Sequence, residues 1–354
     1  MKIPLKHVSL LAGAVTAIIS SLGAVETVPV GYISKDVNPN ADLRLGIPFK
    51  QGATFRSAVD TVNAGVIGVA ASVPDVTTDA HYLLVTNGPL VGNWFQVTDS
   101  SDSSITVAVD LENEGLLTGN TFEVIPFWTL DSLFPSGGDI PQSSDVLNPV
   151  AFILLNDVSQ TGTNLAATGG TFVFHSGEQV AAGWYDTSGD FSSTAGSQIL
   201  SPETYITIRN ETGSIVSVTV AGTVPDTTIA NDIVSRLAGN QDNQIVNPFP
   251  AGVTLSTSEL FEDGVIRASS DVLNPLDLLF VFEGSPDGKN PTASLTAIYH
   301  DGAQVAEGWY DLSGDFSSTI DSYELPLGGA LIVRRVAGAD GLITWTPALP
   351  YSLD

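Results

Sequence analysis

The chain has 354 residues, of which 43% are hydrophobic and only 14% charged, with 34 glycines and 20 prolines. This composition is typical of strands separated by turns, excludes a disordered chain, and suffices for two or three domains with their own cores. The formal net charge of −27 disfavours nucleic acid and anionic membranes as partners, and the absence of cysteine excludes disulfides and thiol chemistry. The excess of acidic residues is better explained by a contribution to solubility than by binding of divalent cations.

Residues 1–24 are predicted to be a secretory signal peptide. Lys2 and Lys6 precede an uncharged apolar run at 8–22, and small residues suit cleavage near 23–25. The run is short for a membrane span and no second apolar segment follows it. We therefore expect export through the general pathway, to the periplasm, the cell surface or the extracellular space. A retained N-terminal anchor is the alternative.

Residues 65–128 alternate between apolar and polar side chains with turn signals between the runs. This pattern predicts five short strands, which suit a small barrel or sandwich. The expected strands are 65–71, 81–86, 93–98, 105–110 and 121–128. Residues 128–135 are expected to form a short helical or turn connector.

The sequence GWYDTSGDFSST at 183–194 returns as GWYDLSGDFSST at 308–319, so that eleven of twelve residues agree. A match of this length indicates an internal duplication. It extends outward until residues 143–225 match residues 269–350, at an offset of 126 before a single-residue gap and 125 after it. Each copy reads as about six strands separated by turns rich in glycine.

A fainter match relates PFKQGAT at 48–54 to PFPAGVT at 248–254, at an offset of 200. The extra sequence of the first copy therefore lies between 55 and 143, around the five predicted strands. We predict an all-β fold of two related sandwich-like or barrel-like units, the first carrying an inserted small five-stranded subdomain. The first unit comprises 25–64 and 129–225, the insert 65–128, and the second unit 226–354. Residues 226–240 are expected to be a short helix or an irregular linker.

Several short motifs occur in a recognisable order: VGY at 30–32, IPFWTLDSLFP at 125–135, ITIRN at 206–210 and NQDN at 240–243. This order resembles an uncharacterised family of secreted, β-rich proteins that occurs as paralogues in verrucomicrobial and related environmental bacteria. The resemblance covers nearly the whole mature chain. It implies export and a β-rich fold, and it offers no catalytic residues. The chain departs from that family at the GWYDxSGDFSST stretch, which replaces a simpler aromatic-plus-turn segment.

The repeated stretch suggests a calcium site. Oxygen-bearing side chains alternate along it, and they could converge on one cation if the backbone curls. The glycine at the fourth position and the lack of a closing bidentate acid do not match an EF-hand. A β-turn capped by its own Asp and Ser side chains is favoured, with calcium as the alternative cofactor. The candidate ligands are Asp186, Ser188, Asp190, Asp311, Ser313 and Asp315.

The aromatic pairs Trp184–Tyr185 and Trp309–Tyr310 could form a sugar-stacking platform. In a strand, however, one of two adjacent aromatics points inward, and a buried tryptophan is the commoner outcome. Core packing is therefore favoured over ligand binding for these four residues.

Arg209 and Arg334 end apolar strands at equivalent places, and Asp145 and Asp271 begin the two copies. We expect an internal Arg–carboxylate pair that braces each unit, with simple surface placement as the alternative.

Catalytic motifs are scarce. His81, His175 and His300 lie too far apart in sequence to form a zinc pair, and no nucleophile elbow, phosphate loop or dinucleotide fingerprint occurs. A glycosidase needs only two well-placed carboxylates, and 39 acidic residues leave that alternative open.

The expected function is therefore that of an exported, non-enzymatic β protein acting as a cell-surface, extracellular-matrix, adhesion or structural component. The alternative is a carbohydrate-binding or calcium-binding module that uses the repeated loops. Polysaccharide and other surface proteins are the expected partners. Exposed edge strands could also pair between molecules and give self-association.

Overall fold

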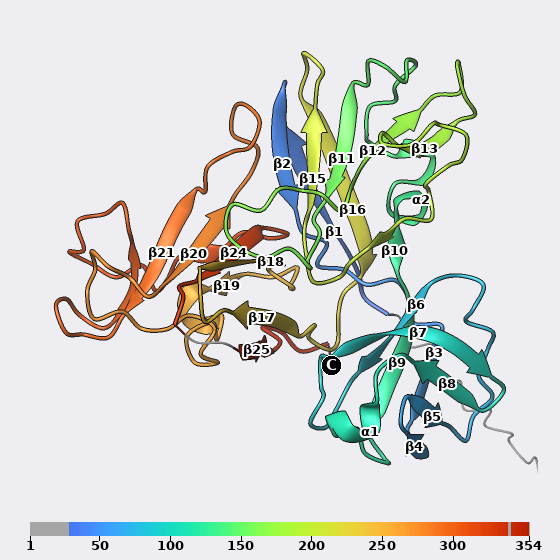
Figure 1. Ribbon diagram of the computed structural model, residues 1–354, viewed down its shortest axis with the longest axis horizontal. Helices are drawn as coiled ribbons and strands as arrows, with labels where there is room; N and C mark the ends of the chain where they lie inside the picture. The colour runs from blue at the N-terminus through green and yellow to red at the C-terminus, as the bar shows by residue number, and fades with distance from the viewer. Residues whose placement is uncertain (1–27, 339–340, 354) are drawn as a thin grey trace, which may run out of the picture.

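The computed structural model describes residues 28–338 and 341–353, so the predicted signal peptide lies outside the described residues. The prediction of an all-β fold is confirmed. Figure 1 shows three lobes: a first unit containing β1, β2 and β10–β16, a second unit containing β17–β25, and an inserted sheet containing β3–β9. In the part of the chain that the structure describes, no helix is long and apolar enough to cross a membrane.

The first unit is built on a five-stranded antiparallel sheet in the order β13-β12-β11-β15-β2. Two ribbons, β1–β16 and β10–β14, complete the unit, and the short helix α2 (Leu130–Leu133) follows β10. The strands are β1 (Val30–Val37), β2 (Ala41–Leu45), β10 (Trp128–Thr129), β11 (Ala151–Leu155), β12 (Gly170–His175), β13 (Gly183–Asp186), β14 (Ile199–Leu200), β15 (Ile206–Asn210) and β16 (Val216–Thr223).

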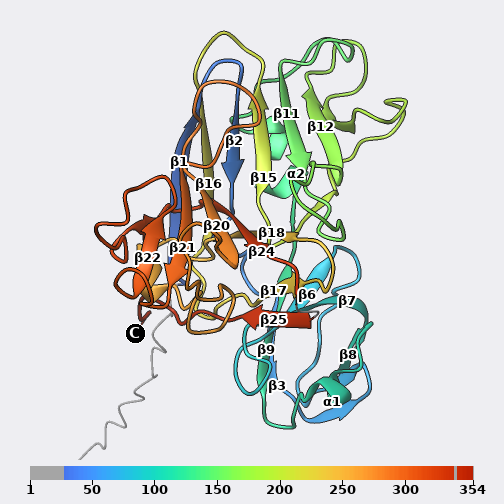
Figure 2. The same ribbon diagram turned by 60° about the vertical axis from the view of Figure 1, so that its left-hand side comes forward.

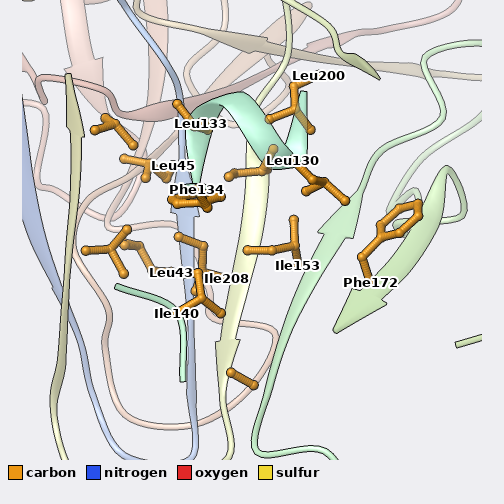
Figure 3. Packing of buried hydrophobic residues seen from close by; sticks show 14 of the residues in the cluster. Leu43, Leu45, Leu130, Leu133, Phe134, Ile140, Ile153, Phe172, Leu200 and Ile208 are labelled. Carbon is orange, nitrogen blue, oxygen red and sulfur yellow. The ribbon is translucent and has the colours of Figure 1, made fainter. Parts of the chain in front are cut away.

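The core of the first unit lies between one face of this sheet, the β1–β16 ribbon and the α2 segment. In β11 the side chains of Ala151, Ile153 and Leu155 are buried on that face, while Phe152 and Leu154 point to the other face. Figure 3 shows how residues from separate strands meet the helix. Its labelled residues are Leu43, Leu45, Leu130, Leu133, Phe134, Ile140, Ile153, Phe172, Leu200 and Ile208.

The second unit has a five-stranded sheet whose order, β22-β21-β20-β24-β18, matches the first sheet strand for strand. The ribbons β17–β25 and β19–β23 likewise correspond to β1–β16 and β10–β14. This is the arrangement that an internal duplication predicts, and the duplication itself stays a prediction. The strands are β17 (Asn231–Ser235), β18 (Gln241–Val246), β19 (Val253–Thr254), β20 (Asp277–Phe282), β21 (Leu295–His300), β22 (Gly308–Asp311), β23 (Glu324–Leu325), β24 (Ala330–Arg335) and β25 (Gly341–Trp345).

The expectation of a helix or irregular linker at 226–240 is wrong, because β17 occupies the middle of that segment. Its side chains alternate between buried and exposed, as a strand requires, but the buried positions include Asn231 and Ser235. Because polar residues occupy buried positions, the apolar–polar alternation by which a strand is recognised in the sequence is absent here.

The inserted sheet has seven strands in the order β3-β9-β6-β7-β8-β5-β4. Each of the five predicted ranges overlaps one of its strands, although β7 runs past residue 98 and β8 begins before residue 105, and β3 and β4 precede the predicted start. The sheet therefore begins at Phe55, which pairs with Val124. The strands are β3 (Phe55–Ala58), β4 (Thr61–Asn63), β5 (Val66–Gly68), β6 (His81–Val85), β7 (Trp94–Ser101), β8 (Ser104–Val107) and β9 (Thr121–Pro126), with α1 (Leu111–Glu114) after β8.

A buried lysine joins the inserted sheet to the first unit and to the segment between the units. Lys50, which is 4% exposed, forms ion pairs with Glu123 of β9 and with Asp226 of the segment between the units. Arg56 of β3 lies with its Nε 2.6 Å from Glu123. Two carboxylates thus compensate the burial of the lysine charge where the inserted sheet meets the segment between the units.

Candidate functional site

The first aspartates of the two repeated loops cap the turn that follows them. The Oδ1 of Asp186 accepts hydrogen bonds from the backbone N–H and the hydroxyl of Ser188, each at 2.8 Å. Asp311 and Ser313 repeat both bonds at 2.8 Å. These are the bonds of the turn interpretation.

The second aspartates of the loops are held in the same way. Ser192 N–H donates to Asp190 at 2.9 Å, and Ser317 N–H donates to Asp315 at 3.0 Å. The hydroxyl and the backbone N–H of the serine lower the pKa of each carboxyl. Among the described residues, no three His, Cys, Asp or Glu side chains gather as a metal site would require. Calcium binding at these loops, with Ser188 and Ser313 as further ligands, stays a prediction.

The aromatic pairs of the repeated stretch are buried. Trp184 and Trp309 lie in the two unit cores and are 0% and 1% exposed. The rings of Tyr185 and Tyr310 are also buried, and each hydroxyl donates to a backbone carbonyl four residues earlier at 2.9 Å. The core interpretation fits the structure. The sugar-stacking alternative does not, because no ring face is available to a ligand.

Both expected arginines form bidentate ion pairs, but with other aspartates than the sequence suggested. Arg209 donates from Nε and Nη2 to Asp42 of β2 at 2.8 and 2.9 Å. Arg334 donates in the same way to Asp242 of β18 at 2.6 and 2.9 Å. The hydrogen bonds to these carboxylates raise the pKa of both guanidinium groups.

The expected partners, Asp145 and Asp271, cap the turns that open each repeat instead. Asp145 accepts from the backbone N–H of Leu147 at 2.9 Å, and Asp271 accepts from that of Leu273 at the same distance. The pairing went unrecognised because β2 and β18 lie outside the strongly matched part of the repeat. The offset of 200 seen at residues 48–54 nevertheless relates Asp42 to Asp242.

Each buried aspartate also receives a loop from the other unit. The loop between β11 and β12 of the first unit crosses to β18 of the second. There the carbonyl of Gly162 accepts from the N–H of Asp242 at 2.8 Å, and the N–H of Asn164 donates to the Asp242 carboxylate at 2.7 Å.

The reverse contact uses the equivalent residues. The loop between β20 and β21 of the second unit rises beside β2 of the first (Figure 2). The carbonyl of Gly288 accepts from the N–H of Asp42 at 3.2 Å, and the N–H of Asn290 donates to the Asp42 carboxylate at 2.8 Å. The two units therefore clamp each other's edge strands reciprocally, so that β2 and β18 are covered rather than open to another chain.

Two adjoining cavities border this reciprocal contact, and we call them together the inter-unit groove. The first cavity has a volume of about 340 Å³ and the second about 290 Å³, and Leu165 and Gln244 line both. The first cavity is lined by apolar side chains, such as Val158, Val234 and Ile245, and by amide and carboxyl side chains, among them Gln160, Glu203, Asn231, Asp232, Gln241 and Asn243. The second is lined by Arg44, Leu154, Asn156, Tyr205 and Thr207, among others.

Two carboxyl groups of different character face the first cavity. Burial, and then the charge of Asp232, raise the pKa of Glu203. Asp232 is exposed and accepts a hydrogen bond from the Thr344 hydroxyl at 2.9 Å. A carboxyl group biased toward its protonated form, as Glu203 is, can donate a proton or a hydrogen bond.

No local motif could have marked this pair. Glu203 lies in the first unit and Asp232 in the second, and the fold alone brings them to one cavity. None of the residues that the sequence analysis named as metal or sugar ligands lines either cavity.

Comparisons with known proteins add no functional assignment to this geometry. The chain matches no protein-family model, no curated protein and no solved structure.

Proposed function

We propose that the chain is an exported, non-enzymatic β protein of the cell surface or extracellular matrix that binds carbohydrate in the inter-unit groove. The observation that carries this proposal is the lining of the first cavity. The carboxyl groups of Glu203 and Asp232 offer hydrogen-bonding partners to the hydroxyl groups of a sugar, between walls that internally bonded amides hold in place. Ligand sites also occur preferentially where domains meet.

The walls of this cavity are held before any ligand arrives. The Gln241 side chain accepts from Gly162 N–H at 2.9 Å and donates to the carbonyl of Gln160 at 3.2 Å. Asn243 is fixed in turn to both backbone groups of Val234, at 2.8 and 3.0 Å. Because these side chains are already ordered, a ligand would lose little conformational entropy on their account.

A substitution at the wall of the first cavity tests the proposal. Val234 lines the cavity and is 43% exposed, so an arginine there would occupy the space of a ligand. We expect Val234→Arg to weaken carbohydrate binding at least ~tenfold, measured by calorimetry with oligosaccharides first selected on a glycan array. Val66→Arg is the matched control, because Val66 is an equally exposed strand valine (41%) in the inserted sheet.

Binding that is unchanged in Val234→Arg would move the site out of the groove. The absence of any bound glycan on a broad array would remove the carbohydrate proposal altogether. A structural role in a matrix, with self-association through open edge strands, would then remain as the proposal.

The pair Glu203 and Asp232 favours a second candidate function, hydrolysis of a glycosidic bond with Glu203 as general acid. Release of reducing ends by the purified protein, abolished in Glu203→Gln, would establish it and end the non-enzymatic proposal. No release from the polysaccharides that bind would support binding alone.

The Glu203→Gln variant also has an expected stability. Because the folded state raises the pKa of this carboxyl above its unfolded value, folding disfavours the ionised form. The wild type therefore loses stability as the pH rises from the unfolded pKa, near 4.5, through the folded one. We expect the melting temperature of Glu203→Gln to exceed that of the wild type at pH 7 and to converge with it below about pH 4. A difference independent of pH would contradict this.

A further inference from the structure

The two units differ at the equivalent walls of their sheets. On β20 and β24 the paired residues Phe280 and Ile332 belong to an apolar cluster on the outer face of the second sheet. On β11 and β15 the equivalent pair is Leu154 and Thr207, which is smaller and more polar. The second cavity opens at this place and is lined by both. The second cavity is therefore specific to the first unit and is not a general feature of this kind of sheet.

The same comparison of the two units singles out one charged residue, Arg44. Arg44 pairs with Thr207 in the first sheet as Gln244 pairs with Ile332 in the second, so arginine stands where the other unit has glutamine. The guanidinium carbon of Arg44 lies 3.8 Å from the ring centroid of Phe282, across the contact between the units. Stacking on an aromatic face orients the group and leaves its N–H donors free.

Arg44 is unneutralised. Among the described residues, no carboxylate oxygen lies within 4.0 Å of its guanidinium nitrogens, and its side chain donates no hydrogen bond. Asp42 also lines the second cavity, but its carboxylate is held by Arg209 and by the N–H of Asn290. The chain has a net charge of −27, so most of its arginines can find a carboxylate partner. An arginine that has no such partner and that borders a cavity is a candidate group for binding an anionic ligand.

Neutral hydrogen-bonding groups lie beside this charge in the second cavity, together with the ion pair of Arg209 and Asp42. The Tyr205 hydroxyl accepts from Gln244 at 3.2 Å, and Asn156 and Thr207 line the same cavity. The volume of about 290 Å³ is of the size that a single sugar residue needs. Since the cavity adjoins the first one through Gln244 and Leu165, a chain held in one can place its next residue in the other.

We propose that the second cavity is a subsite for a uronic acid residue, whose carboxylate pairs with the guanidinium of Arg44. This inference rests on the proposed function and deepens it, because it names the carbohydrate as an acidic one. Planar guanidinium and carboxylate groups match in two parallel hydrogen bonds, whereas a neutral hexose offers only a hydroxymethyl group at the same place.

Monosaccharide titrations test the subsite. The probes are D-galacturonate and D-glucuronate with their neutral parents D-galactose and D-glucose, in 0.15 M salt, where the Debye length of about 8 Å screens the net charge of the protein. We expect the wild type to bind one uronate at least ~tenfold more tightly than its parent hexose. Arg44→Gln, which installs the residue of the second unit, should bring that ratio close to one, and Arg44→Lys should restore part of it.

Arg236→Gln is the control. Arg236 also lacks a carboxylate partner among the described residues but lines neither cavity, so its loss should leave the ratio unchanged. Equal affinity of the wild type for a uronate and its parent, or a preference that survives in Arg44→Gln, would overturn the subsite while leaving carbohydrate binding intact. Binding of none of the four sugars, and of no glycan on an array, would overturn the proposed function and the subsite with it.

Discussion

Replacing Asp242 with alanine should lower the free energy of unfolding by about 3 kcal/mol. The carboxylate is 3% exposed and accepts two bonds from Arg334 and one from the N–H of Asn164. Its removal leaves a partly buried guanidinium without its counter-charge and a backbone donor without its acceptor. Urea unfolding followed by tryptophan fluorescence measures the loss, and Asp42→Ala should reproduce it in the other unit.

The same variant should also loosen the contact between the units. Because Asp242 holds the β11–β12 loop of the first unit, we expect faster hydrogen exchange at Gly162 and Asn164 than in the wild type. Asp271→Ala is the control, since Asp271 is only half-buried and bonds within its own turn. If Asp271→Ala and Asp242→Ala destabilise equally, the reciprocal clamp is not a major contribution to stability.

The strands of the inserted sheet could be predicted because its residues alternate clearly between glycine-rich and serine-rich turns. The prediction began too late, at 65, because β3 and β4 have only four and three residues. In β3 the residues are alternately half-buried and exposed, without one fully buried apolar side chain. Strands this short are stabilised by pairing with strands that are distant in the sequence. A pattern read over a few neighbouring residues contains no information about those distant partners.

The arginine pairs show how far a repeat can guide prediction. The offset of 125 correctly predicts that Arg209 and Arg334 have equivalent surroundings, and both do form internal ion pairs. It cannot say which strand lies beside β15, since that depends on the order of the sheet. One available signal was missed: Gly162-x-Asn164 and Gly288-x-Asn290 recur at the offset of 126 and form the reciprocal clamp.

The candidate site could not be predicted at all. Its side chains come from strands β2, β11, β15, β17 and β18, from two loops and from the segment before β15, and the site needs two units in contact. The strongest sequence signal for a functional site is the stretch in which the two copies agree most. The structure places that agreement in turns and cores, whereas Arg44 and Thr207, which differ from Gln244 and Ile332, line a cavity. Where two units share one strand order, the residues that agree can preserve the scaffold, and a single site can arise where the residues differ.

The tryptophans of the repeated stretch test directly whether the residues shared by the two units serve the scaffold and not ligand binding. Trp309→Ala should lower the free energy of unfolding by about 4 kcal/mol, because the side chain is 1% exposed and its removal leaves a large cavity in the second core. Trp184→Ala should cost about as much in the first unit. Denaturant unfolding measures both, and Tyr32→Ala is the control, since that ring is 74% exposed.

The conservative change then separates packing from recognition. Trp309→Phe fills most of the space, so it should lose clearly less stability than Trp309→Ala and should bind glycans as the wild type does. A ligand platform would behave in the opposite way, because loss of the indole would weaken binding more than it weakens the fold. Trp309→Phe could instead abolish glycan binding while leaving the melting temperature unchanged. The repeated stretch would then be a recognition element, and the inter-unit groove would not be the binding site.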